Sequence, residues 1–391
     1  MFIPLIVTKS TFFPFVFGKA IVFQVLVEIA FILWIIWRVW FFKKQDQKKS
    51  LKENLLNYSI YFFFLILFIT TLTSLDSIRS FWSTQERMTG FFNWIHFGMF
   101  YIMLVSLFKK KDFVWILRTA LCISLIASIT ALFSDKIQGR LVGTLGNAGF
   151  LAIYLLFHVF FSIWLLIKDR FWFWRLFYMS ALILNLITLY YTRTRGAYLG
   201  LGVCLVLFIF INSIYYIGFT SPKLGKSKSR RRSKSWSDWR RWAALGVLFV
   251  IIMTALGFAW QQKSAFEQGS RGRVISWSIS WNAFKERPLL GWGPENYILA
   301  FAKHFDPAYA DYSKEWFDKA HNSVFEFLVT TGVFGLLGYL MILIFASIKS
   351  PKFIIPLFLA YFIASLFWMD TTASLMLLFL VLAMAQKRVF A

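Results

Sequence analysis

The sequence GSRGRVISWSISWNAFKERPLLGWGPEN (Gly269–Asn296) lies within Gln261–His321, the only long polar insertion in an otherwise apolar chain. A new apolar run begins directly after His321. Other apolar runs reach the length of about 20 residues that a helix needs to cross the hydrocarbon core of a membrane. The sequence therefore predicts a scaffold of membrane helices that holds one large polar loop at a membrane surface.

The composition indicates an α-helical membrane protein. The 391 residues are 59% hydrophobic and 15% charged, and a soluble domain could not bury that much apolar surface. The expected fold is an all-α polytopic transmembrane bundle, with N-terminal membrane helices (1–260), a loop with short amphipathic helices (261–322) and C-terminal membrane helices (323–391). The apolar runs predict eleven spans, at 20–42, 55–75, 91–108, 113–134, 147–167, 171–191, 197–217, 242–260, 323–348, 353–369 and 371–386.

The positive charge predicts the orientation of the chain. The net charge is +24, and one set of short alternate loops collects Lys and Arg, above all the stretch 221–241. Such loops stay in the cytoplasm, which places 261–322 on the extracytoplasmic face. The run Arg230–Arg232 resembles an RNA-binding segment. Because it lies between two spans, we interpret it as contact with anionic membrane lipids and expect no nucleic-acid partner.

The N-terminus is expected to lie outside if eleven spans end with a cytoplasmic C-terminus. The short apolar piece Phe2–Val7 then has the character of the tail of a twelfth helix. This pattern predicts a longer upstream reading frame with one more apolar span.

Three groups of arginines fall on the predicted extracytoplasmic side, where positive charge is normally scarce. They are Arg140, the pair Arg193 and Arg195, and the pair Arg271 and Arg273. Long cationic side chains at helix ends commonly reach lipid phosphates, which is the structural explanation for any one of them. Three groups on this face favour a shared anionic ligand, and a diphosphate suits paired arginines better than a single carboxylate.

The third group is predicted to lie at the start of an amphipathic helix. The apolar face of this helix has helical spacing and consists of Val274, Trp277, Trp281 and Phe284. Ser270 is the expected N-cap, and Arg287–Pro288 marks the expected end. Arg271 and Arg273 would then lie in the first turn, where free backbone N–H groups and guanidinium groups converge on a bound anion.

His321 is the histidine best placed for chemistry, because it stands directly before a predicted span. Ser323 and Glu326 fit a capping box for that span. Nearby arginines lower the pKa of a histidine and keep it neutral, as a general base requires. The extracytoplasmic carboxylates show no metal-ligand spacing, so no metal and no cofactor are expected. The stretch Gly291–Pro294 is predicted to form a tight turn.

Five short motifs in a fixed order resemble the O-antigen ligase/polymerase superfamily. The motifs are Arg140–Asn147, Thr194–Gly200, Gly272-Arg273 followed by Trp277, Pro288–Asn296, and His321-Asn322 followed by Thr331–Gly335. The resemblance covers roughly residues 85–390. Members of this superfamily usually have twelve spans with the N-terminus inside.

The resemblance implies a metal-independent glycosyltransferase of the bacterial cytoplasmic (inner) membrane, active on the extracytoplasmic face in cell-envelope polysaccharide biosynthesis. Its donor would be an undecaprenyl-diphosphate-linked glycan and its acceptor a sugar hydroxyl on a glycan or glycolipid. Arg195 and Arg273 would hold the diphosphate and His321 would assist the acceptor, with inversion at the anomeric carbon. Three aromatic residues of the loop are candidates for stacking on sugar rings or, equally, for interfacial anchoring: Trp277, Trp292 and Tyr297.

The alternative is a polytopic transporter or flippase for an anionic lipid-linked substrate. Such a protein is expected to carry charged residues within its spans or an internal repeat. The predicted spans are nearly free of charge, with Glu28 and Arg118 as the main exceptions. Between ligase and polymerase the sequence leaves the choice open, because the two differ only in the acceptor.

Overall fold

The computed structural model describes residues 1–41, 51–206, 263–311, 316–351 and 354–390, and this part of the chain is helical. The all-α fold is confirmed. The long helices are α1 (Phe17–Phe41), α2 (Leu51–Leu72), α4 (Phe91–Leu107), α5 (Lys110–Leu132), α6 (Ala148–Lys168), α7 (Trp172–Tyr191), α10 (Lys263–Glu286), α12 (Ser323–Lys349), α13 (Ile355–Ser365) and α14 (Thr372–Gln386). The short elements are α3 (Ser77–Trp82), α11 (Tyr297–Lys303) and the 3-10 helices Ile3–Leu5, Gly143–Leu145 and Pro307–Asp311.

The predicted spans coincide with these helices, although some are shorter than expected. Among the described residues, six helices are long and apolar enough to cross a membrane, namely α1, α2, α5, α6, α7 and α12. The spans predicted at 353–369 and 371–386 correspond to helices of only 11 and 15 residues, because the chain leaves the helix between Leu366 and Thr371. The predicted span 197–217 is described as helix up to Val206, and 242–260 lies outside the described residues.

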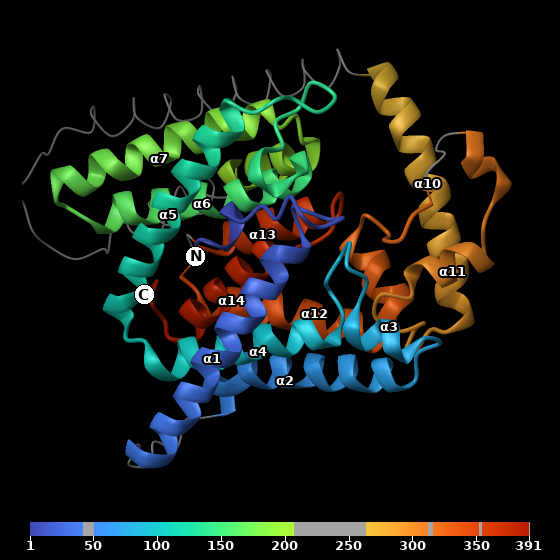
Figure 1. The fold of residues 1–391 in the computed structure, drawn as a ribbon, viewed down its shortest axis with the longest axis horizontal. Helices are drawn as coiled ribbons and strands as arrows, with labels where there is room; N and C mark the ends of the chain where they lie inside the picture. Colours follow the sequence, from blue (N-terminus) through green and yellow to red (C-terminus); the bar gives the residue numbers. More distant parts are fainter. Residues whose placement is uncertain (42–50, 207–262, 312–315, 352–353, 391) are drawn as a thin grey trace, which may run out of the picture.

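The helix α14 forms the centre of the bundle. All 15 of its residues are buried, as expected for a helix that is apolar all round. It contacts α4 on one side and α6 on the other. Figure 1 shows α5, α6 and α7 together on one side of the molecule and α1, α2 and α4 on the opposite side, with α12, α13 and α14 between them.

The long polar insertion folds into a unit with a small hydrophobic core of its own. Side chains from α10, α11 and the following segment meet in this core, among them Ile279, Ala283, Trp292, Tyr297 and Phe301. The unit packs on the first part of α12 through α10 and α11. The insertion is therefore fixed to the bundle rather than only tethered at its ends.

A break in α12 provides the docking site for this insertion. Gly332 has φ +66° and interrupts the helix, which frees the carbonyl groups of the preceding turn. Two of them accept from the turn at Gly291–Pro294: Trp292 N donates to Val329 O and Gly293 N to Thr330 O, both at 2.8 Å. A side chain at Gly332 would clash with Leu289 O, since a Cβ there would lie 2.2 Å away. The predicted tight turn is confirmed.

The predicted start of α10 is wrong. The helix begins at Lys263, so Ser270 lies within it and does not cap it. Gly and Ser cost at most about 1 kcal/mol inside a helix, and here they do not end it. Arg271 and Arg273 therefore lie in the helix interior, and an anion bound to them would meet guanidinium groups rather than free backbone N–H groups.

The predicted apolar face of α10 is not the face that packs on the protein. Val274 and Trp281 are exposed, whereas the buried side carries small residues, including Ser276, Ser280 and Ala283. Small residues allow close approach to the rest of the insertion. The exposed apolar face keeps the character expected of a helix lying at a membrane interface.

Candidate active site

His321 lies two residues before the first residue of α12. Its backbone has φ +51°, a value that residues other than glycine rarely adopt. Its Nδ1 donates to the Lys319 carbonyl at 3.0 Å, so Nε2 carries the lone pair that can accept a proton. The imidazole ring contacts Phe317 and Trp368, with ring centroids 4.6 and 5.6 Å away. The cap of α12 is Asn322, whose Oδ1 accepts from Val324 N at 2.9 Å.

The predicted capping box of Ser323 and Glu326 is wrong, because the helix begins one residue earlier than that motif requires. Ser323 is the first helical residue, and Asn322 caps it. Glu326 reaches back to the Ala320 N–H at 2.9 Å and to Lys319 at 3.1 Å. The carboxylate therefore fixes the segment before His321 rather than the helix end itself.

The environment of His321 favours its neutral form. The pKa of His321 is lowered to about 4, chiefly by burial, and the positive charges of Arg87 and Arg273 act in the same direction. The Lys319 carbonyl and the Asp318 carboxylate act in the opposite direction but do not outweigh burial. At neutral pH the side chain is thus uncharged and can act as a general base.

A cavity opens beside His321. Its volume is about 610 Å³, including space open to the solvent, and it lies between the insertion, α12 and the α13–α14 turn. Its wall includes Glu295, Lys319, Glu326 and Asp370. The Asp370 carboxylate accepts from the Tyr361 hydroxyl at 2.6 Å, and burial raises the pKa of Asp370. The cavity is thus rich in groups that can bond to hydroxyls.

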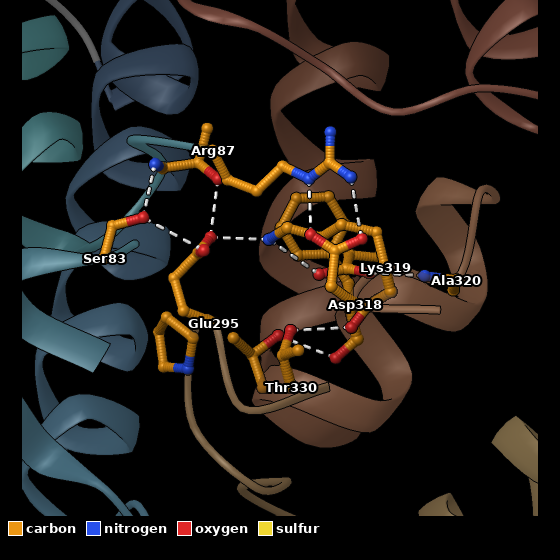
Figure 2. A network of polar contacts seen from close by, with 12 residues as sticks. Ser83, Arg87, Glu295, Asp318, Lys319, Ala320 and Thr330 are labelled. Atoms are coloured by element: carbon orange, nitrogen blue, oxygen red, sulfur yellow. Dashed lines mark hydrogen bonds and ion pairs between the residues drawn. The ribbon is translucent and has the colours of Figure 1, made fainter. Parts of the chain in front are cut away.

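A buried ion-pair network supports this wall (Figure 2). Lys319 Nζ lies 2.5 Å from Glu295 Oε1 and 3.1 Å from Glu326 Oε1. Glu295 also accepts from the hydroxyls of Ser83, at 3.0 Å, and Thr89, at 2.5 Å. Burial alone would lower the pKa of Lys319, but the two carboxylates outweigh burial and raise that pKa above its ordinary value.

The arginines predicted from three separate loops influence one another in the structure. Burial lowers the pKa of Arg273, and the positive charges of Arg195 and Arg140 lower it further. Arg140 Nε donates to the Thr192 carbonyl at 2.9 Å, which joins its loop to the start of the helix Arg195–Val206, the Arg195 helix. Arg273 also lowers the pKa of His321. The helix α10, the Arg195 helix and the segment before α12 thus bring these side chains to one region.

This arrangement is suited to an anion. Positive charges held near one another destabilise the unliganded site, and a bound anion would relieve this repulsion. Guanidinium groups match phosphate oxygens in geometry as well as in charge. The neutral imidazole of His321 lies next to this cationic region, on the side of the cavity.

The remaining predicted site residues are placed differently. Arg193 is exposed, as Arg195 is, and has φ +50°, and its charge acts on Tyr198 together with that of Arg140. The side chain of Arg271 lies outside the described part of the chain. Trp292 and Tyr297 are 2% and 1% exposed, which contradicts the expectation that they stack on sugar rings. Their polar atoms already bond within the insertion, to Ala283 O and Ser280 Oγ.

Trp277 differs from Trp292 and Tyr297 because part of its side chain is exposed, so the predicted stacking on a sugar ring stays a prediction for this residue. It is half-buried, and its ring stacks on Phe325 with centroids 5.7 Å apart. The other three histidines have local partners. His96 and His304 pair with Glu28 and Glu286, both at 2.9 Å, and His158 bonds to the carbonyl of Tyr154.

Sequence reasoning missed the charged residues around His321. Arg87 comes from the segment between α3 and α4, and Glu295 follows the glycine turn, so neither has a spacing that relates it to His321. One signal was present: Asp318 and Lys319 place two charges directly before the histidine. Only the fold shows that the partners of these charges come from distant segments.

Residues 180–340 match the model of a protein family described as O-antigen ligase. The matched range includes Arg195, Arg273, the whole polar insertion and His321. A search of curated proteins found no match to this chain.

Proposed function

Since the chain belongs to the O-antigen ligase/polymerase superfamily of membrane glycosyltransferases, we propose that it transfers a glycan from an undecaprenyl-diphosphate carrier to a sugar hydroxyl. The proposal places this reaction on the extracytoplasmic face of the bacterial inner membrane. The observation that supports it is the mutual electrostatic effect of Arg140, Arg195 and Arg273 beside a neutral His321, with Arg140 hydrogen-bonded to Thr192 and Thr194 just before Arg195.

Arg195 and Arg273 bind the diphosphate of the donor in this proposal. Each charge-assisted hydrogen bond contributes about 1.5–3 kcal/mol. Negative charge grows on the diphosphate as the bond between the anomeric carbon and the phosphate oxygen breaks. Interactions that strengthen with this charge stabilise the transition state more than the bound donor, and therefore accelerate transfer.

His321 acts as the general base. Its Nε2 takes the proton of the acceptor hydroxyl while the hydroxyl oxygen attacks the anomeric carbon. Attack from the side opposite the diphosphate inverts the anomeric configuration. The products are the elongated or ligated glycan and the undecaprenyl diphosphate. The low pKa of His321 keeps Nε2 unprotonated before the acceptor arrives.

The acceptor distinguishes ligase from polymerase. Both activities require the same donor chemistry at the arginines. A panel of acceptors, including glycan repeats and a lipid-linked core sugar, separates them when the products are sized.

The direct test is glycan transfer by purified protein with a lipid-linked donor. Arg195→Ala and Arg273→Ala should each lower kcat/KM by about 10²–10³-fold, as removal of one transition-state charge partner does elsewhere. Lys285→Ala is the matched control, since Lys285 is an exposed cation on the same helix as Arg273, about 18 Å away along the axis. Activity retained in both arginine variants contradicts the proposal. Movement of the donor across the membrane without transfer would favour a flippase.

A further inference from the structure

The backbone conformation of His321 requires an external cause. A non-glycine residue with φ +51° persists only where the surrounding structure imposes it. Strain of this kind is often found where a side chain must be aimed at a reacting group.

The three residues before His321 are each held by a side chain from elsewhere in the chain. Asp318 forms a two-bond ion pair with Arg87, in which Arg87 Nε donates to Oδ2 and Nη2 donates to Oδ1 at 2.8 Å. Lys319 Nζ lies 2.5 Å from Glu295 Oε1. Ala320 N–H donates to Glu326 Oε2 at 2.9 Å.

The same segment fixes the imidazole. The carbonyl that accepts from His321 Nδ1 belongs to Lys319, the central residue of the held segment. The orientation of this carbonyl therefore depends on the ion pairs on both sides of it. An accepting carbonyl at Nδ1 also selects the tautomer that leaves Nε2 free to take a proton.

We propose that the ion pairs of Arg87 with Asp318 and of Lys319 with Glu295 and Glu326 position His321 for proton transfer. This inference rests on the proposed function, in which His321 is the general base. Arg87 and Asp318 are absent from the cavity wall, so they can position His321 only through the segment that they hold. Lys319, Glu295 and Glu326 hold the same segment and also line the cavity.

The experiment compares Asp318→Asn with a matched control in the full-length protein, using the transfer assay and pH profiles. Asp318→Asn should lower kcat by about 10–100-fold, the effect of a small misplacement of a reacting group. The KM for the donor should stay within about twofold, because uniform binding is not lost. Arg87→Lys keeps the charge but not the two-bond geometry, and should retain more activity than Asp318→Asn.

The pH profile separates positioning from loss of charge. Charged groups around His321 are Arg87, Asp318, Lys319 and Arg273. If the ion pairs no longer hold His321 in place, its imidazole becomes exposed to solvent. The apparent pKa of the acid limb of kcat/KM should then rise from about 4 toward the ordinary histidine value of 6.5. If His321 stays in place and only the Asp318 charge is lost, the limb should move to lower pH, because that charge raises the pKa of His321.

The control is Asp169→Asn, in a comparable ion pair with Arg118. Side-chain exposure is 17% for Asp169 and 22% for Asp318. In the control pair, Arg118 Nη2 lies 2.6 Å from Asp169 Oδ2. Asp169→Asn should lower the melting temperature to a similar extent and leave kcat unchanged. Arg87→Lys provides the test if Asp318→Asn does not fold.

Three results overturn the inference. Unchanged kcat in Asp318→Asn, with turnover abolished by His321→Ala, overturns the positioning role and leaves the proposed function standing. An effect of Asp318→Asn on the donor KM alone, with kcat unchanged, also overturns the positioning role. Full turnover in His321→Ala overturns the proposed base, and the positioning role with it.

Discussion

At the scale of single residues, the chemistry depends on a histidine kept neutral beside positive charge. Burial and two arginines lower the pKa of His321, and a backbone carbonyl fixes its tautomer. These two effects leave Nε2 unprotonated and available to the acceptor hydroxyl at neutral pH. The same buried position limits how far the side chain can turn away from the cavity.

This environment predicts a particular pH dependence. The pKa of His321 is lowered to about 4, so its neutral form persists well below neutral pH and is lost only as the pH falls through that value. The pH profile of kcat/KM, which reports the free enzyme, should be flat from about 6 to 8 and fall near pH 4. An acid limb near 6.5 would show that His321 is not buried in the free enzyme, or is not the base.

Replacing His321 tests the role of the base separately from the profile. His321→Ala should lower kcat by about 10²–10⁴-fold, the usual contribution of a positioned base. Donor binding should change little, because the diphosphate is bound by arginines. Titration of the purified variant with the lipid-linked donor checks this. A loss of donor affinity with unchanged kcat would assign His321 to binding.

The sequence predicted these site residues unevenly. Arg195, Arg273 and His321 follow from charge on an unusual face and from motif order, and in the structure Arg195 acts electrostatically on Arg273, which in turn acts on His321. The burial of Trp292 and Tyr297 did not follow, because aromatic residues next to glycines suit a binding surface and a small core equally well. That Arg195, Arg273 and His321 act in catalysis stays a prediction.

At the scale of elements, the break in α12 connects the insertion to the bundle. Gly332 ends one helical segment, and the freed carbonyls bond to the turn around Trp292. The sequence predicted the turn from its glycines, but it did not predict the break, because a glycine such as Gly332 within the apolar run 323–348 is also tolerated inside a continuous helix. The early start of α10 was missed for the opposite reason, since Gly269, Ser270 and Gly272 are typical of a helix end.

Gly332→Ala should destabilise the protein. A Cβ at this position lies 2.2 Å from Leu289 O, and φ +66° is strained for alanine, at a cost of about 1–3 kcal/mol before the clash is added. Gly202→Ala is the control, because a Cβ there meets nothing within 4 Å. Thermal unfolding in detergent measures both. An unchanged melting temperature for Gly332→Ala would show that the break does not constrain the fold.

At the scale of the whole molecule, a fully buried α14 and its neighbours form a rigid frame for groups from distant segments. Arg140 lies between α5 and α6, Arg273 in α10 and His321 before α12, yet the charge of Arg140 acts on Arg273 and the charge of Arg273 acts on His321. Alternate loops of a polytopic protein share one face, so the predicted orientation requires these connections to lie together. The helical fold was predictable from apolar runs, whereas the break positions and the short α13 were not.

The predicted orientation can be checked by thiol labelling in intact cells. Cys122 and Cys204 are first replaced by serine, and single cysteines are placed at exposed Ala302 and at Ser227. The positive-inside rule predicts that an impermeant reagent labels position 302 and not position 227. Labelling of position 227 alone would reverse the orientation and place the candidate site in the cytoplasm.

Binding of the carrier headgroup tests the central claim most directly. Wild-type protein in nanodiscs should bind undecaprenyl diphosphate at least about tenfold more tightly than the monophosphate, which corresponds to about 1.4 kcal/mol of additional interaction. Replacing both Arg195 and Arg273 by glutamine should abolish this preference while the melting temperature stays near that of the wild type. A variant with both Arg195 and Arg273 replaced that binds the diphosphate with wild-type affinity and preference would contradict the account.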